Sequence, residues 1–161
     1  MTIVPIIMGS KADLAHGQTI AAELKEFGIA SEIRVASAHK VAKYLLELLA
    51  AYESGPKPKA YITIAGRSNA LSGLIDAHVA APVIACPPPS EAFGGADIFS
   101  SLRMPSGVTP AVVLEPKNAA LFVAKIIGTN DEKVRAAVRK KQAAASDQVI
   151  ADDRALNGLD K

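Results

Sequence analysis

One short polar segment carries side chains that could transform a small anionic molecule. Ser37, Ala38, His39 and Lys40 directly follow an apolar run. An imidazole exchanges a proton near neutral pH, and a neighbouring ammonium group can hold an anion and leave the imidazole free. The alternative is that Ser37 caps a helix and that the residues behind it are merely solvated. His39 is therefore the candidate for proton transfer, and Lys40 is a candidate anion ligand.

A second polar segment, Gly9–Asp13, is a tight turn leading into a helical pattern. The free N–H groups and the dipole of a helix N-terminus favour a phosphate, to which Ser10 can add a hydroxyl donor. The carboxylate of Asp13 would repel a phosphate and suits the hydroxyls of a sugar. Alternatively, Asp13 only complements the helix dipole. Glycine and serine are common in such turns, so this segment is a weak signal by itself.

Small residues dominate a third segment, Ala65–Gly73, where the backbone can approach a ligand closely. Arg67 could bind a carboxylate or an anion derived from carbon dioxide, or it could pair with a nearby acid for structural reasons. A fourth segment, Cys86–Ser90, contains three successive prolines, which can continue neither a strand nor a helix and so form a rigid wall. Since nothing in the sequence activates its thiol, we interpret Cys86 as a buried, small apolar residue.

The other histidines, His16 and His78, lie in expected helical segments, and we interpret both as structural. None of the 3 histidines has a His-x-x-His or Glu-x-x-His spacing, so the sequence predicts no catalytic metal. The single cysteine precludes an intramolecular disulfide and fits a reducing compartment.

The elements that must position these segments are short apolar runs that alternate with helical patterns. The 161 residues, 50% of them hydrophobic, suffice for one domain with a sizeable core. Five runs of mostly Val, Ile and Ala are typical of parallel strands covered on both faces: 3–8, 32–36, 60–65, 82–86 and 110–114. We therefore predict a three-layer α/β/α sandwich with a parallel sheet of about five strands, flavodoxin-like or Rossmann-like. Ligands of such sheets bind at the carboxyl ends of the strands, where the polar segments lie.

Two helical patterns flank the first runs. Residues 11–27 place Ile20, Leu24 and Phe27 on one side, and Gly28 is suited to end that helix. The next helix has an apolar face with spacings of three and four, made of Val41, Tyr44, Leu45, Leu48, Leu49 and Tyr52.

The composition becomes highly charged after Gly128. We expect a catalytic domain over 1–128 and a C-terminal helical extension over 129–161, with its helix over 132–150. Its apolar stripe is thin and consists of Val134, Val138, Ala145 and Val149. Such a helix could lie on its own subunit, lie on a neighbouring subunit or fray, and we favour the neighbouring subunit. The last residues, 152–161, are expected to be loose.

Charge and hydropathy limit the possible partners. A formal net charge of +2 provides no field that argues for nucleic acid or an anionic membrane. No stretch of 18 apolar residues exists, and the first run lacks the basic flank of a signal peptide. We therefore expect a cytoplasmic protein.

Taken together, the polar segments resemble the small carboxylating enzymes of purine biosynthesis that act on 5-aminoimidazole ribonucleotide (AIR). The resemblance covers nearly the whole chain. It rests on 8–10 with Asp13, on 37–40, on 65–69 and on Ser100–Gly107, while Pro116–Leu121 resembles a helix of the family that adjoins subunit contacts.

The third segment distinguishes two branches of this family. In the mutase branch that loop carries its own histidine, whereas residues 65–73 contain none here. The chain thus resembles the carboxylase branch, which converts AIR and carbon dioxide to 4-carboxy-5-aminoimidazole ribonucleotide (CAIR) without ATP. The alternative is the mutase reaction, which consumes N5-carboxyaminoimidazole ribonucleotide.

The resemblance also implies residue roles. It assigns the proton of the reacting carbon to His39, the phosphate to Ser10 and Lys40, and the ribose hydroxyls to Asp13. It assigns binding of the nascent carboxylate to the loop of Gly66, Arg67, Ser68 and Asn69. The remaining predicted binding residues are Gly9, Ser37 and Ala38. No cofactor is implied. Related enzymes form octamers with sites at subunit boundaries, so a homo-octamer is expected. Ala12 stands where the family usually has a phosphate-binding serine, which predicts weaker substrate binding.

A binding module without enzymatic activity, flavodoxin-like or receiver-like, would share the same sheet pattern. Receiver chemistry needs an aspartate at the end of the third strand, where Ala65 stands. Flavin binding favours aromatic residues, and the loops of the expected crevice offer almost none except Phe93. Both variants of this alternative are therefore disfavoured.

Overall fold

A five-stranded parallel sheet forms the centre of the protein. The computed structural model describes residues 3–55 and 58–158. The strand order is β2-β1-β3-β4-β5, as in flavodoxin-like proteins, and the predicted sandwich is confirmed. The strands are β1 (Ile3–Met8), β2 (Ala30–Val35), β3 (Tyr61–Ile64), β4 (Val83–Ala85) and β5 (Ala111–Val112).

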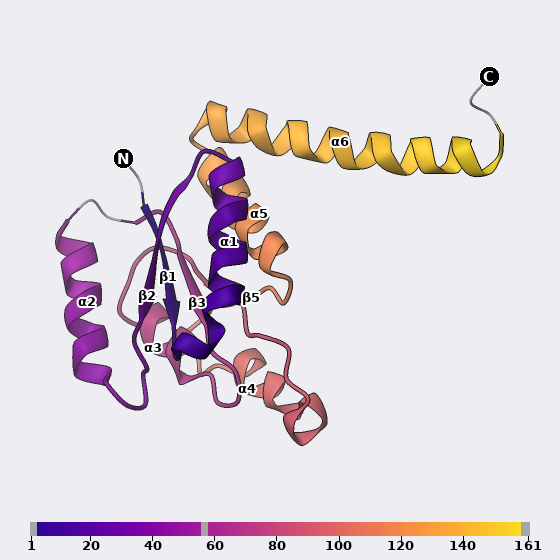
Figure 1. Ribbon diagram of the computed structural model, residues 1–161. Coiled ribbons are helices and arrows are strands. Elements are labelled where there is room, and N and C mark those ends of the chain that lie inside the picture. Colours follow the sequence, from indigo (N-terminus) through magenta and orange to yellow (C-terminus); the bar gives the residue numbers. More distant parts are fainter. Residues whose placement is uncertain (1–2, 56–57, 159–161) are drawn as a thin grey trace.

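Helices cover both faces of the sheet. The helical elements are η1 (Lys11–Asp13), α1 (Leu14–Glu26), α2 (Ala42–Ser54), α3 (Ala70–Asp76), η2 (Ala92–Ile98), α4 (Phe99–Leu102), α5 (Pro116–Gly128) and α6 (Glu132–Leu156). Figure 1 shows α1 beside α5 on one face, with α2 and α3 on the other. Each crossover helix returns the chain to the amino end of the sheet, so every strand runs in the same direction and the polar loops that follow the strands gather at the carboxyl end.

The core has two halves because alternate residues of a strand face opposite sides. Ile6 and Met8 of β1 pack with α1 and α5, whereas Ile7 packs with α2 and α3. The predicted inner face of α1 is buried: Ile20, Leu24 and Phe27.

The predicted apolar face of α2 is only partly right. Leu45, Leu48 and Leu49 are buried, as predicted. Val41 and Tyr44, however, are 44% and 45% exposed. The phenol oxygen of Tyr44 instead accepts a hydrogen bond from Arg34 on the edge strand β2 (3.0 Å). The amphipathic pattern in the sequence thus begins about one turn before the part of α2 that is buried in the core.

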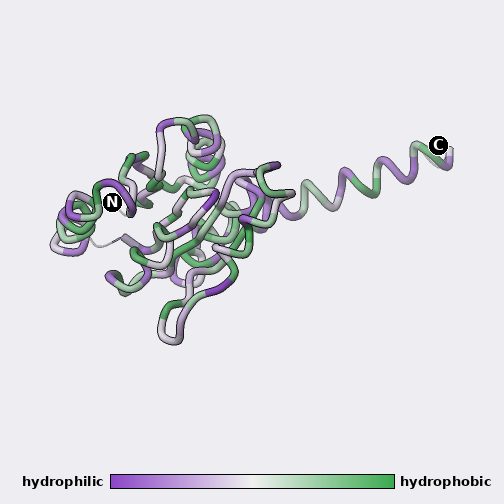
Figure 2. Tube along the Cα trace, turned by 90° about the horizontal axis from the view of Figure 1, so that it is seen from below, coloured by the Kyte–Doolittle hydropathy of each residue, from purple (hydrophilic) through white to green (hydrophobic). Residues whose placement is uncertain are grey.

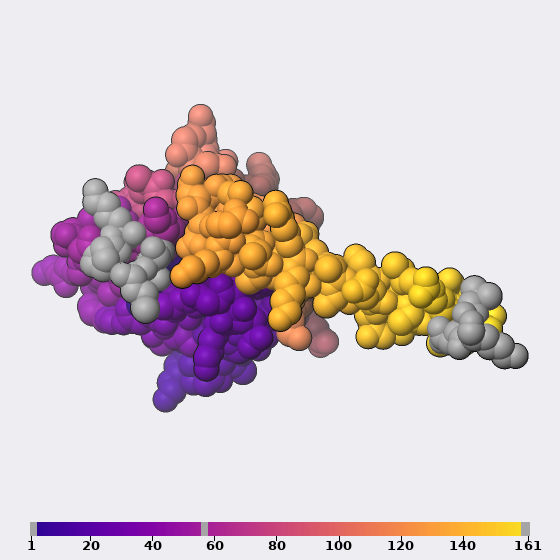
Figure 3. All heavy atoms as spheres, turned by 90° about the horizontal axis from the view of Figure 1, so that it is seen from above, coloured from indigo at the N-terminus to yellow at the C-terminus, as the bar shows by residue number. Residues whose placement is uncertain are grey.

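The C-terminal helix α6 is longer than predicted and projects from the domain. Its N-cap Asp131 accepts hydrogen bonds from two backbone N–H groups, and Val134 and Val138 pack in the core beside α5. Every residue from Arg139 to the end of the helix is exposed, but Lys141 still forms an ion pair with the buried Glu23 of α1 and stands over the Phe27 ring. Beyond Lys141, Figures 1, 2 and 3 show the helix projecting as a free rod.

The expectation that 152–161 is loose is wrong as far as Leu156, since the helix continues to that residue. Gln148 donates to Asp152 (2.8 Å), and this pair, spaced i to i+4, supports the last turns. Residues 159–161 lie outside the described residues. Within the described part of the chain, no helix has the length and apolarity needed to cross a membrane.

Candidate active site

The loops after β1, β2, β3 and β4 enclose a crevice of about 540 Å³ at the carboxyl end of the sheet. It brings together all the predicted site residues except Asn69: Gly9, Ser10, Asp13, Ser37, Ala38, His39, Lys40, Gly66, Arg67 and Ser68. The other lining residues are Ala12, Ala65, Leu71, Pro88, Pro89 and Ser90. Segments far apart in the sequence thus meet at one place, as the parallel topology requires.

The first loop enters α1 through a tight 3-10 turn. Ser10 caps this turn, because its Oγ accepts the backbone N–H of Ala12 (3.2 Å) while its carbonyl accepts that of Asp13 (3.2 Å). Two N–H groups that the sequence assigned to a phosphate are therefore already bonded. The hydroxyl hydrogen of Ser10 can still be donated to a ligand.

The carboxylate of Asp13 lies at the start of α1 without capping it. Burial raises the pKa of Asp13 above its ordinary value, and the nearby His16 acts in the opposite direction. A desolvated carboxylate that makes no cap bond gains from a ligand that donates hydrogen bonds to it. This environment suits hydroxyl groups better than an anion.

The second loop forms a turn rather than the first turn of a helix. The Oγ of Ser37 accepts the N–H of Lys40 (3.3 Å), and its carbonyl accepts the N–H of Val41 (3.0 Å). Because Val41 has non-helical backbone angles (φ −141°, ψ 44°), α2 begins only at Ala42. Ser37 therefore caps this turn and not the helix α2, contrary to the alternative that the sequence left open. Among the described residues, the side chains of His39 and Lys40 have no hydrogen-bond or ion-pair partner, and both are exposed at the crevice.

The third loop has an unusual backbone at Arg67, whose φ of 57° lies in the left-handed region. Two groups from the η2–α4 segment hold it. The carboxylate of Asp97 accepts the Arg67 N–H (3.0 Å), and the Ser100 hydroxyl lies 3.2 Å from the Arg67 carbonyl. Neither residue was recognised as part of the site from its type, although Ser100 begins a family motif.

Asn69 shapes the loop and does not line the crevice. Its side chain is buried, accepts the N–H of Ser72 (3.1 Å) as the N-cap of α3, and donates to the Ser101 hydroxyl (2.9 Å). The structure therefore places this amide behind the loop.

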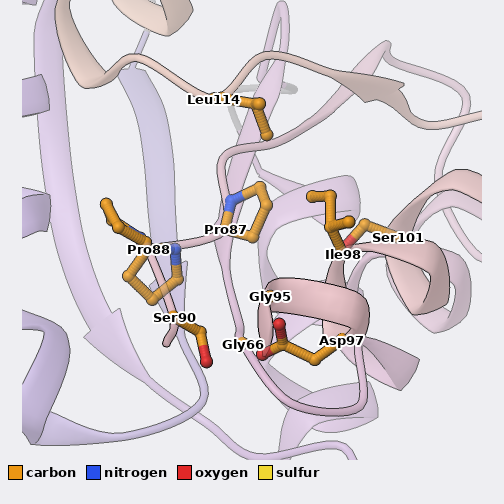
Figure 4. Close-up of a pocket in the computed structure, with 10 residues that line it drawn as sticks. Gly66, Pro87, Pro88, Ser90, Gly95, Asp97, Ile98, Ser101 and Leu114 are labelled. Atoms are coloured by element: carbon orange, nitrogen blue, oxygen red, sulfur yellow. The ribbon is translucent and has the colours of Figure 1, made fainter. Parts of the chain in front are cut away.

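The proline segment separates the crevice from a second, more apolar cavity of about 340 Å³. Figure 4 shows Pro87, Pro88 and Leu114 around it, with Asp97 and Gly66 on another side. Gly66, Pro88, Pro89 and Ser90 line both spaces. The prolines therefore form the wall that the sequence predicts, with Cys86 buried behind it.

The groups in the crevice suit an organic anion better than a metal. Over residues 3–55 and 58–158, no three His, Cys, Asp or Glu side chains cluster as a metal site would require. The site instead offers one imidazole, two cationic side chains, hydroxyls and one carboxylate. This set can bind a phosphorylated sugar, orient it and move a proton.

Known proteins share both the sequence and the fold. The family model described as AIR carboxylase matches residues 3–148. The phosphoribosylaminoimidazole carboxylase of Treponema denticola is 53% identical over 154 residues, which cover 96% of this chain and 97% of that protein. The phosphoribosylaminoimidazole carboxylase of Archaeoglobus fulgidus is 52% identical over 94% of this chain and 83% of that protein.

A solved structure agrees with these matches. The crystal structure of Treponema denticola PurE superposes with a TM-score of 0.95 at 52% identity, over 97% of this chain and 99% of that one. The sequence motifs, the fold and the relatives coincide: this chain belongs to the AIR carboxylase family.

Proposed function

We propose that the crevice carboxylates AIR with carbon dioxide, forming CAIR without ATP in purine biosynthesis. The observation that carries this proposal is the meeting of His39 and Lys40, Asp13 and the Gly66–Ser68 loop in one crevice. The loop lacks the histidine of the mutase branch, and the similar proteins of Treponema and Archaeoglobus are named carboxylases.

His39 is the proposed proton acceptor. The aminoimidazole ring of AIR is an enamine-like nucleophile whose C4 attacks carbon dioxide. A C–C bond forms, and C4 becomes tetrahedral and must lose its proton before the ring regains aromaticity. An exposed imidazole at the crevice wall, not engaged by a described residue, is free to accept this proton.

The other lining residues hold the reactants in place. Ser10 and Lys40 bind the 5′-phosphate, and Asp13 accepts hydrogen bonds from the ribose hydroxyls. Gly66, Arg67 and Ser68 contact the nascent carboxylate, and Asn69 acts through the shape of their loop. Holding two reactants in one geometry lowers the entropic cost of their encounter, so no cofactor is required.

The working form is proposed to be a cytoplasmic homo-octamer. In this proposal residues 1–128 form the catalytic domain and 129–161 an extension. The first turns of α6 pack on α5 of the same chain, and Lys141 pairs with Glu23 of α1. The part beyond Lys141, with Val149 and Ile150 exposed, is free to contact a neighbouring subunit.

Turnover with two substrates tests the proposed reaction. Purified protein is mixed with AIR in bicarbonate-equilibrated buffer without ATP, and CAIR is followed by ultraviolet absorbance. The same assay is repeated with N5-carboxyaminoimidazole ribonucleotide. Saturable turnover of AIR is the expected result. Efficient turnover of the N5-carboxylated compound alone would establish the mutase reaction and contradict the proposal, as would inactivity with both.

A further inference from the structure

The loop that carries Arg67 is held by side chains outside the crevice. The positive φ of Arg67 is unfavourable for a residue with a Cβ, so the conformation needs support from its surroundings. Polar side-chain groups of Asp97 and Ser100 lie against both polar backbone groups of Arg67. Asp97 accepts its N–H at 3.0 Å, and the hydroxyl of Ser100 lies 3.2 Å from its carbonyl oxygen.

Ser100 also joins the loop after β3 to the segment that carries Asp97. Its Oγ accepts the N–H of Asn69 (3.0 Å) and lies 2.8 Å from the carbonyl oxygen of Asp97. One hydroxyl thus ties the loop after β3 to the segment that supplies Asp97. Because the loop is small and glycine-containing, it has few side-chain contacts of its own to fix its path.

From these contacts we infer that Asp97 and Ser100 are positioning residues for the carboxylation reaction, which set the path of the Gly66–Ser68 loop. This inference rests on the proposed function, in which that loop contacts the nascent carboxylate. The Arg67 N–H is already taken by Asp97, so the group that Arg67 offers to the crevice is its guanidinium. Asp97 itself faces the neighbouring apolar cavity and does not line the crevice (Figure 4).

The role predicts that the acceptor oxygen of Asp97 matters more than its charge. A carboxylate close to a forming carboxylate is electrostatically unfavourable, so its negative charge brings no direct benefit to the reaction. Asp97→Asn keeps a carbonyl oxygen for the Arg67 N–H, whereas Asp97→Ala removes the acceptor. A matched control exists in Asp76, whose carboxylate accepts the backbone N–H of Thr109 (2.7 Å) away from the crevice.

The kinetic test compares Asp97→Ala, Asp97→Asn, Ser100→Ala and Asp76→Ala in the full chain. Because the carboxylate forms only during the reaction, Asp97→Ala should lower kcat at least about tenfold and change KM for AIR less than about threefold. Ser100→Ala should lower kcat in the same way by about threefold or more. Asp97→Asn and Asp76→Ala should stay within about threefold of the unmodified protein in both constants.

Trypsin provides a readout that does not depend on activity. Cleavage after Arg67 yields the fragment 1–67, which mass spectrometry identifies, and it requires the loop to leave its fixed path. Asp97→Ala should be cleaved after Arg67 faster than the control Asp76→Ala when the two variants are compared at equal thermal stability. Ser100→Ala should also be cleaved faster than this control, but by a smaller factor. If Asp97→Ala does not fold, Ser100→Ala against Asp76→Ala decides the question.

The inference would be overturned if Asp97→Ala and Ser100→Ala both left kcat and the cleavage rate unchanged, or if they lowered kcat no more than Asp76→Ala does. It would also be overturned if Asp97→Asn lowered kcat as much as Asp97→Ala. Failure of the proposed function is a separate result, because the unmodified protein would then not convert AIR. The cleavage rates would still show whether Asp97 and Ser100 hold the loop.

Discussion

The ring of His16 and the thiol of Cys86 meet behind the crevice, with Nε2 lying 3.3 Å from Sγ. The contact joins the first turn of α1 to the residue that follows β4. The thiol also lies 3.8 Å from the carbonyl oxygen of Leu114, after β5. Both groups are thus used to pack the elements that carry the crevice loops, in agreement with their interpretation as structural residues.

Cys86 should be chemically inert in the folded protein. Burial, with a smaller contribution from the charge of Glu115, raises the pKa of the Cys86 thiol to about 12, and the side chain is fully buried. The thiolate is the reactive form, so almost none is available at pH 8. A thiol reagent such as dithionitrobenzoate should label the denatured chain stoichiometrically and the native protein at least about 100-fold more slowly. Native labelling as fast as that of a free thiol would contradict this environment.

His16 should make the protein less stable in mild acid. Burial lowers the pKa of His16 below 6.5, although Cys86, Asp13 and Glu115 act in the opposite direction. The unfolded chain therefore binds the proton more readily. The free energy of unfolding should fall as the pH drops below about 6.5 and be fully recovered above it. His16→Gln should flatten this dependence in urea titrations at pH 7.5 and 5.5, whereas equal slopes for both proteins would exclude His16 as its source.

His39→Asn should separate binding from turnover. The side chain is exposed at the crevice and is not part of the core, so its replacement should leave the fold intact. Loss of a general base lowers kcat by about 100-fold or more. Binding of AIR should persist and is measured as an increase in Tm on addition of the nucleotide. Near-normal turnover by the variant would remove His39 from its proposed role.

The sequence predicts the sheet and the crevice well because both depend on local patterns. Apolar runs specify buried parallel strands, and the topology then places every loop that follows a strand at one edge. The role of Asn69 could not be predicted in this way. Its amide contacts Ser101, 32 residues later in the chain, and only the fold shows that this bond turns the side chain away from the crevice.

Other differences have the same physical origin. The φ of Arg67 depends on Asp97 and Ser100, which no local preference reveals. In α6 the apolar stripe is too thin to predict where the helix ends. Polar pairs within the helix support its last turns as far as Leu156.

Ala12→Ser should strengthen substrate binding. Ala12 is exposed and lines the crevice beside Ser10, so a serine there adds a hydroxyl where the phosphate is proposed to bind. One additional hydrogen bond contributes about 0.5–1.5 kcal/mol, which corresponds to a decrease in KM for AIR of about two- to tenfold. The value of kcat should change little, since the phosphate is remote from the reacting carbon. An unchanged KM would show that alanine at position 12 does not weaken substrate binding.

The free part of α6 should mediate assembly. Val149, Ile150 and Leu156 are 68%, 50% and 87% exposed, whereas Val134 and Val138 anchor the first turns on the parent domain. Exposed apolar side chains on a projecting helix gain by burial against another subunit. The double substitution Val149→Asp with Ile150→Asp should therefore reduce the oligomer observed by light scattering and lower activity if neighbouring subunits complete the site.

Substitution on the polar face of α6 provides the control for this experiment. Lys140→Asp with Asp147→Lys exchanges two exposed charges of opposite sign, leaves the net charge unchanged, and should leave both the assembly and the fold as they are. Circular dichroism and Tm of both double variants establish that α1 to α5 remain folded, because the substituted positions make no core contact. A fully active monomer of the unmodified protein would contradict a shared site, and an unchanged oligomer in the Val149 and Ile150 variant would exclude this face of α6 from the interface.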